Sequence, residues 1–358
     1  MDNLLKERAR AVDARVAASL ATTAIAIAPA GAAALEMTDQ IAASSAGGKR
    51  LRAQLIAGAH DAFRGPRPDI AIGIGAAVEL FQTAALLHDD VLDDSDTRRG
   101  RPAAHRALAQ LHEQHGWLGS ADDFGAAAGI LAGDLTLMAA HRALFDATSA
   151  LAPAAATTVN ALFADMAELV TVGQYLDMRV AAQPLADIVQ QERAIRDVMR
   201  TKTASYSAEF PLAMGAACAG ASAGSIAAMR DIGVPIGIAF QLRDDVLGLT
   251  GAPAVTGKPA GDDVREGKRT MLVWHAWNAT DAGGRDCLQS TLGRRDASDA
   301  DVAAAVAVVV ATDALERVEA EIESLTRAAS SQLADLDLDA EAKDLLTYLL
   351  GAAAHRSA

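Results

Sequence analysis

The amino-acid sequence predicts an all-helical protein. Hydrophobic residues make up 51% of the 358 residues but aromatic residues only 4%, so the core consists mainly of Ala, Leu, Val and Ile, which suits closely packed helices. Apolar residues recur at spacings of three and four along most of the chain. We find neither an alternation of strands and helices nor a repeat of fixed length. A helical bundle is therefore favoured over a parallel sheet or a solenoid.

The helical spacing is clearest in five segments, which are 70–92, 126–147, 157–180, 225–249 and 313–336. Stretches rich in Gly, Pro or polar residues separate them, at 65–68, 115–125, 182–184 and 251–263. None of these breaks has the composition of an interdomain linker. We therefore expect one domain over residues 1–358, with residues 1–20 as a peripheral N-terminal helix.

Composition also excludes several classes of function. A formal net charge of −14 and a pI near 5.0 argue against general binding to nucleic acid or anionic membranes. Cys218 and Cys287 lack CxxC spacing, which argues against a disulfide framework or a zinc site, and we expect both to fill the core. The apolar stretch 24–35 is too short for a membrane span and contains a proline. We expect a soluble, unprocessed, cytoplasmic protein without a membrane span.

Residues 86–105 read LLHDDVLDDSDTRRGRPAAH and place five aspartates within eight positions. On a helix, Asp89 and Asp93 lie one turn apart on one face, whereas Asp90 is offset by about 100°. Two such carboxylates can hold Mg²⁺ together with water and substrate phosphates, and the arginines that follow can donate to phosphate. The segment alone is equally compatible with a solvated acidic helix end followed by a basic loop.

A second acidic pair, Asp244 and Asp245, occurs in IAFQLRDDVLGLTG after another apolar helical run. Basic groups accompany the two pairs at GGKRLR (47–52), at Lys202 next to Thr203, and in GKPAGDDVREGKRT, which contains Lys258 and Lys268. Each basic group alone suits a solvated surface. Their joint occurrence with paired carboxylates predicts a magnesium and diphosphate site.

These motifs resemble those of the trans-isoprenyl diphosphate synthases, the polyprenyl synthetase family. The matching segments are, in order, GGKRLR, ELFQTAALLHDDVLD, DTRRGRPAAH, LAGD, GQYLD, KT, FQLRDD and GKPAGDDVREGKRT. FQTAALLHDD and AVTGKPAGDDVREGKRT are most similar to actinobacterial short-chain synthases, such as the geranylgeranyl diphosphate synthases. The resemblance implies a homodimeric single-domain bundle around a central catalytic cavity. Its activity would be the condensation of isopentenyl diphosphate with dimethylallyl, geranyl or farnesyl diphosphate.

The resemblance also implies a role for individual residues. Asp89 and Asp93 would hold two Mg²⁺ ions and Asp244 a third. The allylic diphosphate would be contacted by Arg98, Lys202, Thr203, Gln241, Lys258 and Lys268. Isopentenyl diphosphate would be bound by Lys49, Arg52, Gln82 and Arg99. The catalytic set is then the three metal-binding aspartates with Lys202 and Lys258, because metal and cations stabilise the departing diphosphate while the allylic bond ionises.

The sequence departs from the family pattern at two places. Many members carry DDxxD in the second motif, but the last position here is Gly248, and Ala53 stands where GGKRLRP would place proline. Because Asp244 can supply the direct metal contact, we expect little gain in rate from Gly248→Asp. Among the histidines, we expect His105, His112 and His115 to lie in a solvated loop.

Product length should depend on the helix that carries the first motif. Below Asp89, the positions where bulky residues stop the growing chain in this family are Ala85 and Ala84. The next large side chain, Phe81, lies about 12 Å down the helix axis and would act as a floor. These residues predict geranylgeranyl diphosphate as the main product, with a farnesyl or longer-chain polyprenyl diphosphate synthase as the alternative.

Two functions of other classes also remain open. A terpene cyclase would use the same metal chemistry but would not need Lys49, Arg52 and Gln82. A non-catalytic subunit of a heteromeric synthase would be free to lose Asp89, Asp93 and Asp244, all of which are present.

Overall fold

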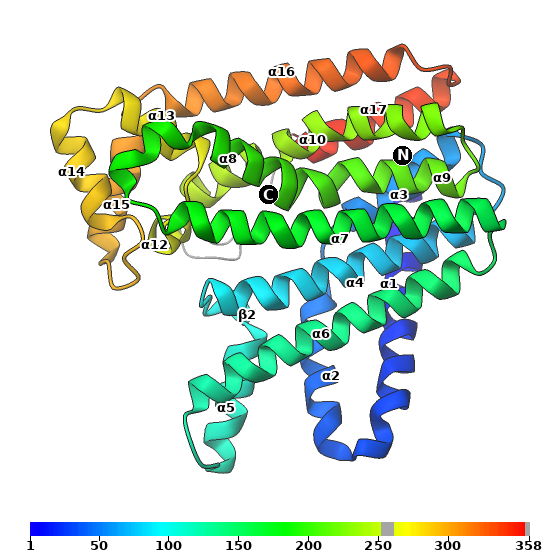
Figure 1. Ribbon diagram of the computed structural model, residues 1–358, viewed down its shortest axis with the longest axis horizontal. Helices are drawn as coiled ribbons and strands as arrows, with labels where there is room; N and C mark the ends of the chain where they lie inside the picture. Colours follow the sequence, from blue (N-terminus) through cyan, green and yellow to red (C-terminus); the bar gives the residue numbers. More distant parts are fainter. Residues whose placement is uncertain (252–260, 355–358) are drawn as a thin grey trace. The chain divides into compact units, whose positions relative to one another are not determined.

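The computed structural model describes residues 1–251 and 261–354 (Figure 1). The chain divides into two compact units, and each is described by itself below. Unit 1 comprises Met1–Ala161 and Met214–Ser222, and unit 2 comprises Leu162–Ala213 and Ala223–Ala358. Two of the three boundaries fall within helices α7 (Pro153–Ala181) and α9 (Phe210–Cys218), and the third lies between Ser222 and Ala223, at the start of helix α10 (Ala223–Thr250). A single domain over residues 1–358 stays a prediction.

Helix α4 (Pro68–Leu92) is the centre of unit 1, because it is buried on nearly every side. It contacts α1 (Asp2–Ile27), α2 (Ala32–Ser45), α3 (Leu51–Ala62) and α6 (Ala121–Thr148). Gly75 and Gly73 permit two of these contacts, since an added Cβ would lie 2.8 Å from the Ala53 Cβ and 2.9 Å from the Ala147 Cβ. The remaining elements of unit 1 are the 3₁₀ turn η1 (Ala28–Ala30), β1 (Thr97–Arg98), β2 (Arg101–Pro102) and α5 (Ala104–His115).

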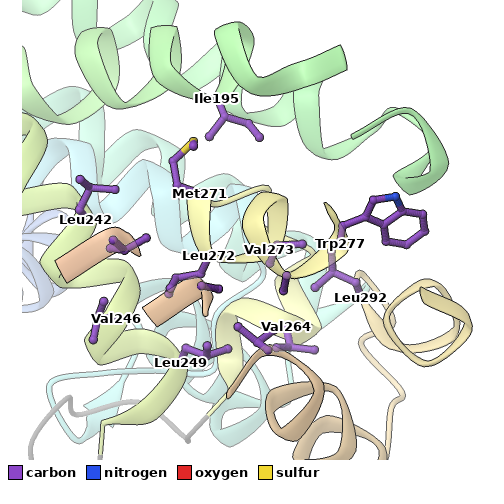
Figure 2. Close-up of a cluster of buried hydrophobic side chains, with 14 of the residues drawn as sticks. Ile195, Leu242, Val246, Leu249, Val264, Met271, Leu272, Val273, Trp277 and Leu292 are labelled. Atoms are coloured by element: carbon purple, nitrogen blue, oxygen red, sulfur yellow. The ribbon is translucent and has the colours of Figure 1, made fainter. Parts of the chain in front are cut away.

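Unit 2 is organised around α10 (Ala223–Thr250), which contacts the π-helical segment η3 (Met199–Glu209), α16 (Ala314–Ala334) and α17 (Ala340–Ala354). Figure 2 shows its apolar core, where Leu242, Val246 and Leu249 of α10 lie near Met271, Leu272 and Val264. The other elements are η2 (Leu185–Gln191), α8 (Glu192–Val198), α12 (Asp262–Glu266), α13 (Met271–Ala279), α14 (Ala282–Thr291) and α15 (Asp299–Val310).

Several helices begin where the sequence supplies a capping side chain. Ser120 accepts a hydrogen bond from the Asp123 N–H at the start of α6, and Thr270 accepts one from Val273 at the start of α13. Helix α15 begins with a capping box between Ser298 and Asp301. These side chains satisfy backbone N–H groups that have no partner within the helix.

The all-helical prediction is confirmed, and 82% of the residues that the structure describes are helical. The five predicted segments correspond to α4, α6, α7, α10 and α16, with ends that differ by a few residues. The solvated loop predicted for the three histidines is wrong, because α5 ends only at His115 and buries His105 and His112. These two residues lie two turns apart on the same face as the buried Leu108.

Four helical segments are long and apolar enough to cross a membrane by length and composition alone. They are Asp2–Ala30, Pro68–Leu92, Ala121–Thr148 and Ala223–Thr250. In α4, 78% of the apolar window is buried inside the protein, so packing in the core accounts for its hydropathy. The absence of a membrane span stays a prediction.

Candidate active site

The first aspartate motif lies at the C-terminal end of α4. The Asp89 side chain is 19% exposed and Asp93 is half-buried, one helical turn further on. Asp90 points to a different side, is buried, and accepts a hydrogen bond from Arg98 Nε at 2.8 Å. The Arg98 guanidinium also lies 3.8 Å from Asp89. Two carboxylates on one half-exposed helix face, with a guanidinium beside them, suit a magnesium-bound phosphate.

Arginines balance much of the remaining acidic charge in this segment. Arg106 of α5 pairs with Asp94 at 2.8 Å, Asp96 at 3.0 Å and Asp122 at 3.2 Å. Together with the contacts of Arg98 to Asp90 and, at 3.8 Å, to Asp89, these contacts give four of the five aspartates in the run an arginine partner. Ion pairs within the protein therefore balance much of the charge of the acidic run, and the metal explanation rests on the shared face of Asp89 and Asp93.

Arg98 and Arg99 are presented by a tight hairpin between β1 and β2. Thr97 pairs with Pro102 and Arg98 with Arg101, so Arg99 and Gly100 form a two-residue turn. Both turn residues have positive φ, 54° and 72°, which is the backbone of a type I′ turn. The Arg99 guanidinium donates to the Ala46 carbonyl at 2.6 Å, which brings the turn to the GGKRLR segment.

A basic cluster forms where these two segments meet. Burial lowers the pKa of Arg99, and the nearby positive charges of Arg50, Arg98 and Arg52 act in the same direction, while Glu79 opposes them. The Arg52 side chain is buried, Lys49 is exposed, and Gln82 is half-buried on α4. Concentrated positive charge is unfavourable unless an anion binds, so the cluster is suited to a diphosphate held by direct cation contacts.

Arg50 anchors this cluster, and the sequence interpretation missed it. Its guanidinium bonds Asp13 of α1 at 2.7 Å, Glu79 of α4 at 3.4 Å and the Ser45 carbonyl at 2.7 Å. Arg50 is buried and has a φ of 51°, a conformation that costs a non-glycine residue of order 1–3 kcal/mol. Glu79 also accepts the Ala53 N–H at the start of α3. This network holds the backbone between Lys49 and Arg52 in place.

In unit 2, η3 carries the predicted Lys202 and Thr203. Lys202 Nζ lies 2.6 Å from Asp177 of the GQYLD segment. Thr203 donates its hydroxyl proton to Gln241 Oε1, and the Gln241 amide donates to Asp245 at 2.6 Å. The structure therefore links Thr203, through Gln241, to Asp245 of the second aspartate motif on α10.

The second motif contains one half-buried and one buried member. Asp244 is half-buried, whereas Asp245 is buried, and this burial raises the pKa of the Asp245 carboxyl well above its usual range. The negative charges of Asp263 and Asp244 raise that pKa further, while the Gln241 hydrogen bond and Lys268 oppose the shift. Asp244 is thus the member with access to an external ligand.

Asp263 lies in the GKPAGDDVREGKRT segment, but the sequence interpretation gave it no role in the site. A Cβ built on Gly248 would lie 2.1 Å from Asp263 Oδ2, so this carboxylate fills the place where a side chain at position 248 would begin. Asp263 also contacts Lys268 at 3.2 Å, and Lys268 lies 2.6 Å from Glu266. A neighbouring helix thus supplies a carboxylate beside the position where the fuller DDxxD motif would carry its last aspartate.

The other predicted site residues are placed as follows. Phe81 and Ala84 are buried on α4, and Ala85 is half-buried. Lys258 lies outside the described residues. In unit 1 the structure brings Arg52 near Arg99, and Gly48, the residue before Lys49, lies beside the Arg99 guanidinium. In unit 2 it joins Thr203 to Gln241 by a hydrogen bond. A cavity shared by the two sets stays a prediction.

Within the described ranges, no group of three or more His, Cys, Asp and Glu side chains is arranged to hold a metal ion. A binding site for magnesium and substrate does not require such a group, because Mg²⁺ keeps several waters and uses one or two carboxylates plus phosphate oxygens. Asp89 and Asp93 on one face of α4 fit that kind of site within unit 1, and Asp244 on α10 supplies a single half-buried carboxylate within unit 2.

Comparison with known proteins decides the family. The polyprenyl synthetase family model matches residues 35–309. The chain belongs to the polyprenyl synthetase family. This polyprenyl synthetase is 34% identical over 255 residues to a geranylgeranyl diphosphate synthase of Sulfolobus acidocaldarius, covering 71% of this chain and 70% of that protein. It is 32% identical over 314 residues to a geranylfarnesyl diphosphate synthase of Aeropyrum pernix, covering 85% and 89% of the two chains.

A solved structure extends the similarity to nearly the whole chain. The geranylgeranyl pyrophosphate synthase of Corynebacterium glutamicum, complexed with isoprenyl diphosphate and magnesium, matches with a TM-score of 0.92 and 34% identity over 99% of each chain. The resemblance found in the sequence, including its actinobacterial character, is confirmed. This polyprenyl synthetase is a trans-prenyltransferase.

Proposed function

We propose that this synthetase condenses isopentenyl diphosphate with an allylic diphosphate and releases geranylgeranyl diphosphate. The observation that carries the proposal is the pairing of two different anion sites within unit 1. One is the Asp89 and Asp93 face of α4, and the other is the basic cluster of Lys49, Arg52 and Arg99. A metal-held diphosphate and a cation-held diphosphate are what a two-substrate condensation requires.

The residues present fit a magnesium-dependent reaction with about three ions per active site. Asp89, Asp93 and Asp244 would hold the metal, which supplies Lewis-acid stabilisation of the charge that develops on the departing diphosphate. The Corynebacterium glutamicum structure contains magnesium and isoprenyl diphosphate, which supports this assignment. A carboxylate pair one turn apart on a half-exposed helix face agrees with the preference of Mg²⁺ for oxygen ligands.

The chain's own cations complete the allylic site. Arg98, Lys202 and Lys268 would donate to diphosphate oxygens, and each is held by a neighbouring carboxylate in the structure. These pairs orient the donors before substrate binds, so less reorganisation is needed as the allylic C–O bond ionises. The Thr203 hydroxyl donates a hydrogen bond to Gln241, so the lone pairs of the Thr203 oxygen can face an electron-poor carbon.

On the acceptor side, Lys49, Arg52, Gln82 and Arg99 would hold isopentenyl diphosphate while its double bond attacks the allylic cation. Arg50 keeps the backbone between Lys49 and Arg52 in position through its contacts with Asp13 and Glu79. A terpene cyclase has no second diphosphate to bind and would not need this cluster. The acceptor cluster therefore favours condensation over cyclisation.

Product length is the finer part of the proposal. Ala84 and Ala85 place only methyl groups at the positions five and four residues before Asp89, and Phe81 lies about two turns before it. Relatives of similar identity include geranylgeranyl and geranylfarnesyl diphosphate synthases, so family membership alone leaves the chain length open. The helix residues select the geranylgeranyl product within that range.

We also propose that the synthetase is a cytoplasmic homodimer. Four apolar side chains at seven-residue spacing are exposed along α6, namely Phe124, Leu131, Met138 and Phe145, with exposed fractions of 37%, 58%, 60% and 69%. A row repeating every seven residues forms one continuous stripe on a helix, as in helix pairs that pack against each other. Sedimentation equilibrium tests this: a single species of twice the chain mass supports the dimer, and a monomer at micromolar concentration refutes it.

The experiment that tests the reaction uses labelled isopentenyl diphosphate with each allylic primer and Mg²⁺, followed by chromatography of the dephosphorylated products. We expect geranylgeraniol as the main product from farnesyl diphosphate. Formation of cyclic hydrocarbons without incorporation of label would instead identify a cyclase, and no turnover with any primer would refute the proposal.

A further inference from the structure

Lys202 and Thr203 lie in an unusually long π-helix. Segment η3 runs from Met199 to Glu209, and the hydrogen bond from the Phe210 N–H to the Ser205 carbonyl continues its i→i+5 pattern. π-helical geometry is rare and usually limited to a single turn. Eleven residues in this geometry therefore require interactions that hold them there.

Glu209 forms the main polar contact at the end of η3. Its side chain is only 1% exposed and accepts two hydrogen bonds from Arg200, at 2.5 and 2.9 Å. Arg230 of α10 donates two more to the same carboxylate, at 3.0 and 2.8 Å, and stacks over the Phe210 ring at 4.7 Å. One buried carboxylate is thus shared by a guanidinium at the start of η3 and another from α10.

The Arg200–Glu209 pair depends on the helical geometry between its members. The two residues are nine positions apart. In an α-helix, nine residues turn through about 900°, which places the side chains on opposite faces. A π-helix has about 4.4 residues per turn, so nine residues complete about two turns and return to the same face. The bidentate contact is therefore compatible with the π geometry and not with the α geometry.

Close backbone contacts along η3 depend on the same geometry. A Cβ on Gly173 of α7 would lie 2.3 Å from the Lys202 N, and Cβ atoms on Gly237 and Gly233 of α10 would lie 2.4 Å from the Cα atoms of Ala204 and Glu209. With Glu209 fixed, a change to α geometry over the seven residues back to Lys202 would rotate that residue by about 125° about the axis. The Lys202 contact with Asp177 would then be lost.

We propose that Arg200 and Glu209 are positioning residues that lock η3 in its π geometry and thereby aim Lys202 and Thr203 at the allylic diphosphate. The proposal rests on the function proposed above for Lys202 and Thr203. The ion pair acts through the helical geometry of η3 and not by binding substrate. Its role is to favour the π geometry over the α geometry. In the π geometry, Lys202 and Thr203 face the diphosphate.

The test compares Arg200→Met with Arg230→Met. Each variant removes one guanidinium from Glu209 and leaves the other, so the buried carboxylate keeps a counter-charge in both. Hydrogen exchange of the amides from 201 to 207 reports the helical geometry without any substrate. In Arg200→Met we expect the exchange rate of these amides to rise at least tenfold. The KM for farnesyl diphosphate should also rise at least tenfold, while the KM for isopentenyl diphosphate stays within twofold of the wild type.

Arg230→Met should change both quantities less than threefold, because its guanidinium is not part of η3. Arg200→Lys, which retains a single charged contact, should recover part of the loss and serves as the second variant if Arg200→Met does not fold. Equal effects of the two methionine variants, or unchanged exchange in Arg200→Met, would overturn the lock. Faster exchange with an unchanged allylic KM would overturn the positioning role. If the wild type fails to condense prenyl diphosphates, the proposed function fails, whereas the exchange comparison still decides the lock.

Discussion

Gly248→Asp restores the last carboxylate of the second aspartate motif, and the structure predicts that it lowers the rate. The sequence alone predicts little change, because Asp244 already supplies a ligand. However, the added Cβ would lie 2.1 Å from Asp263 Oδ2 and 3.0 Å from its Cγ. Asp263 must rotate away, which disturbs its 3.2 Å contact with Lys268.

Two effects set the size of the loss. Overpacking a filled site costs about 1–3 kcal/mol. A second carboxylate about 4 Å from the first adds a repulsion of about 4 kcal/mol at an effective dielectric constant of 20, before Lys268 or metal offsets part of it. Because about 1.4 kcal/mol corresponds to a factor of ten in rate, we expect kcat to fall at least tenfold.

Steady-state kinetics with matched variants separates the two effects. Gly248→Ala introduces the same Cβ without charge, and better helix propensity offsets about 1 kcal/mol of its steric cost, so its kcat should fall less than that of Gly248→Asp. In the double variant Gly248→Asp with Asp263→Ala, the carboxylate moves from one helix to the other, and kcat should return to within about threefold of the wild type. A Gly248→Asp enzyme as fast as the wild type, or a double variant slower than both single variants, would refute the reasoning.

Three further predictions concern the assigned sites. Asp89→Ala should lower kcat about a thousandfold, equivalent to about 4 kcal/mol, with an unchanged unfolding temperature; near-normal turnover with Mg²⁺ would remove Asp89 from the metal site. Arg52→Ala should raise KM for isopentenyl diphosphate at least tenfold and leave KM for farnesyl diphosphate within twofold, and the opposite pattern would show that the two substrate sites are reversed. Ala85→Phe should shorten the main product toward C15 and Phe81→Ala should lengthen it, as measured by chromatography; unchanged lengths in both would show that this face of α4 does not limit the chain.

Local patterns in the sequence predicted the fold class and the long helices. The apolar spacing of 70–92 corresponds closely to α4, because a helix buried on nearly every side has few polar residues to obscure its periodicity. The same local geometry placed Asp89 and Asp93 on one face and Asp90 on another. The buried Asp90 with its Arg98 partner and the half-exposed Asp89 agree with that separation.

Contacts between distant residues could not be predicted in this way. Arg50 and Glu79 are 29 positions apart, and the sequence around each residue does not indicate that the two pair. The role of Asp263 follows from the close approach of α12 to Gly248, which depends on tertiary packing. The π geometry of η3 is similarly invisible, since it depends on glycines of α7 and α10 and on an ion pair that only this geometry permits.

The measurement that tests the account most directly is the metal dependence of binding at the two substrate sites. Isothermal titration calorimetry would measure the binding of two ligands, each in Mg²⁺ and in EDTA. The first ligand is isopentenyl diphosphate. The second is a non-reactive allylic thiodiphosphate, which is added to enzyme already saturated with isopentenyl diphosphate. Because direct cations hold one diphosphate and carboxylate-bound metal holds the other, the Kd for isopentenyl diphosphate should change less than threefold in EDTA, while that for the allylic analogue should rise at least a hundredfold. Equal metal dependence of the two ligands would contradict the assignment of separate cation-held and metal-held sites.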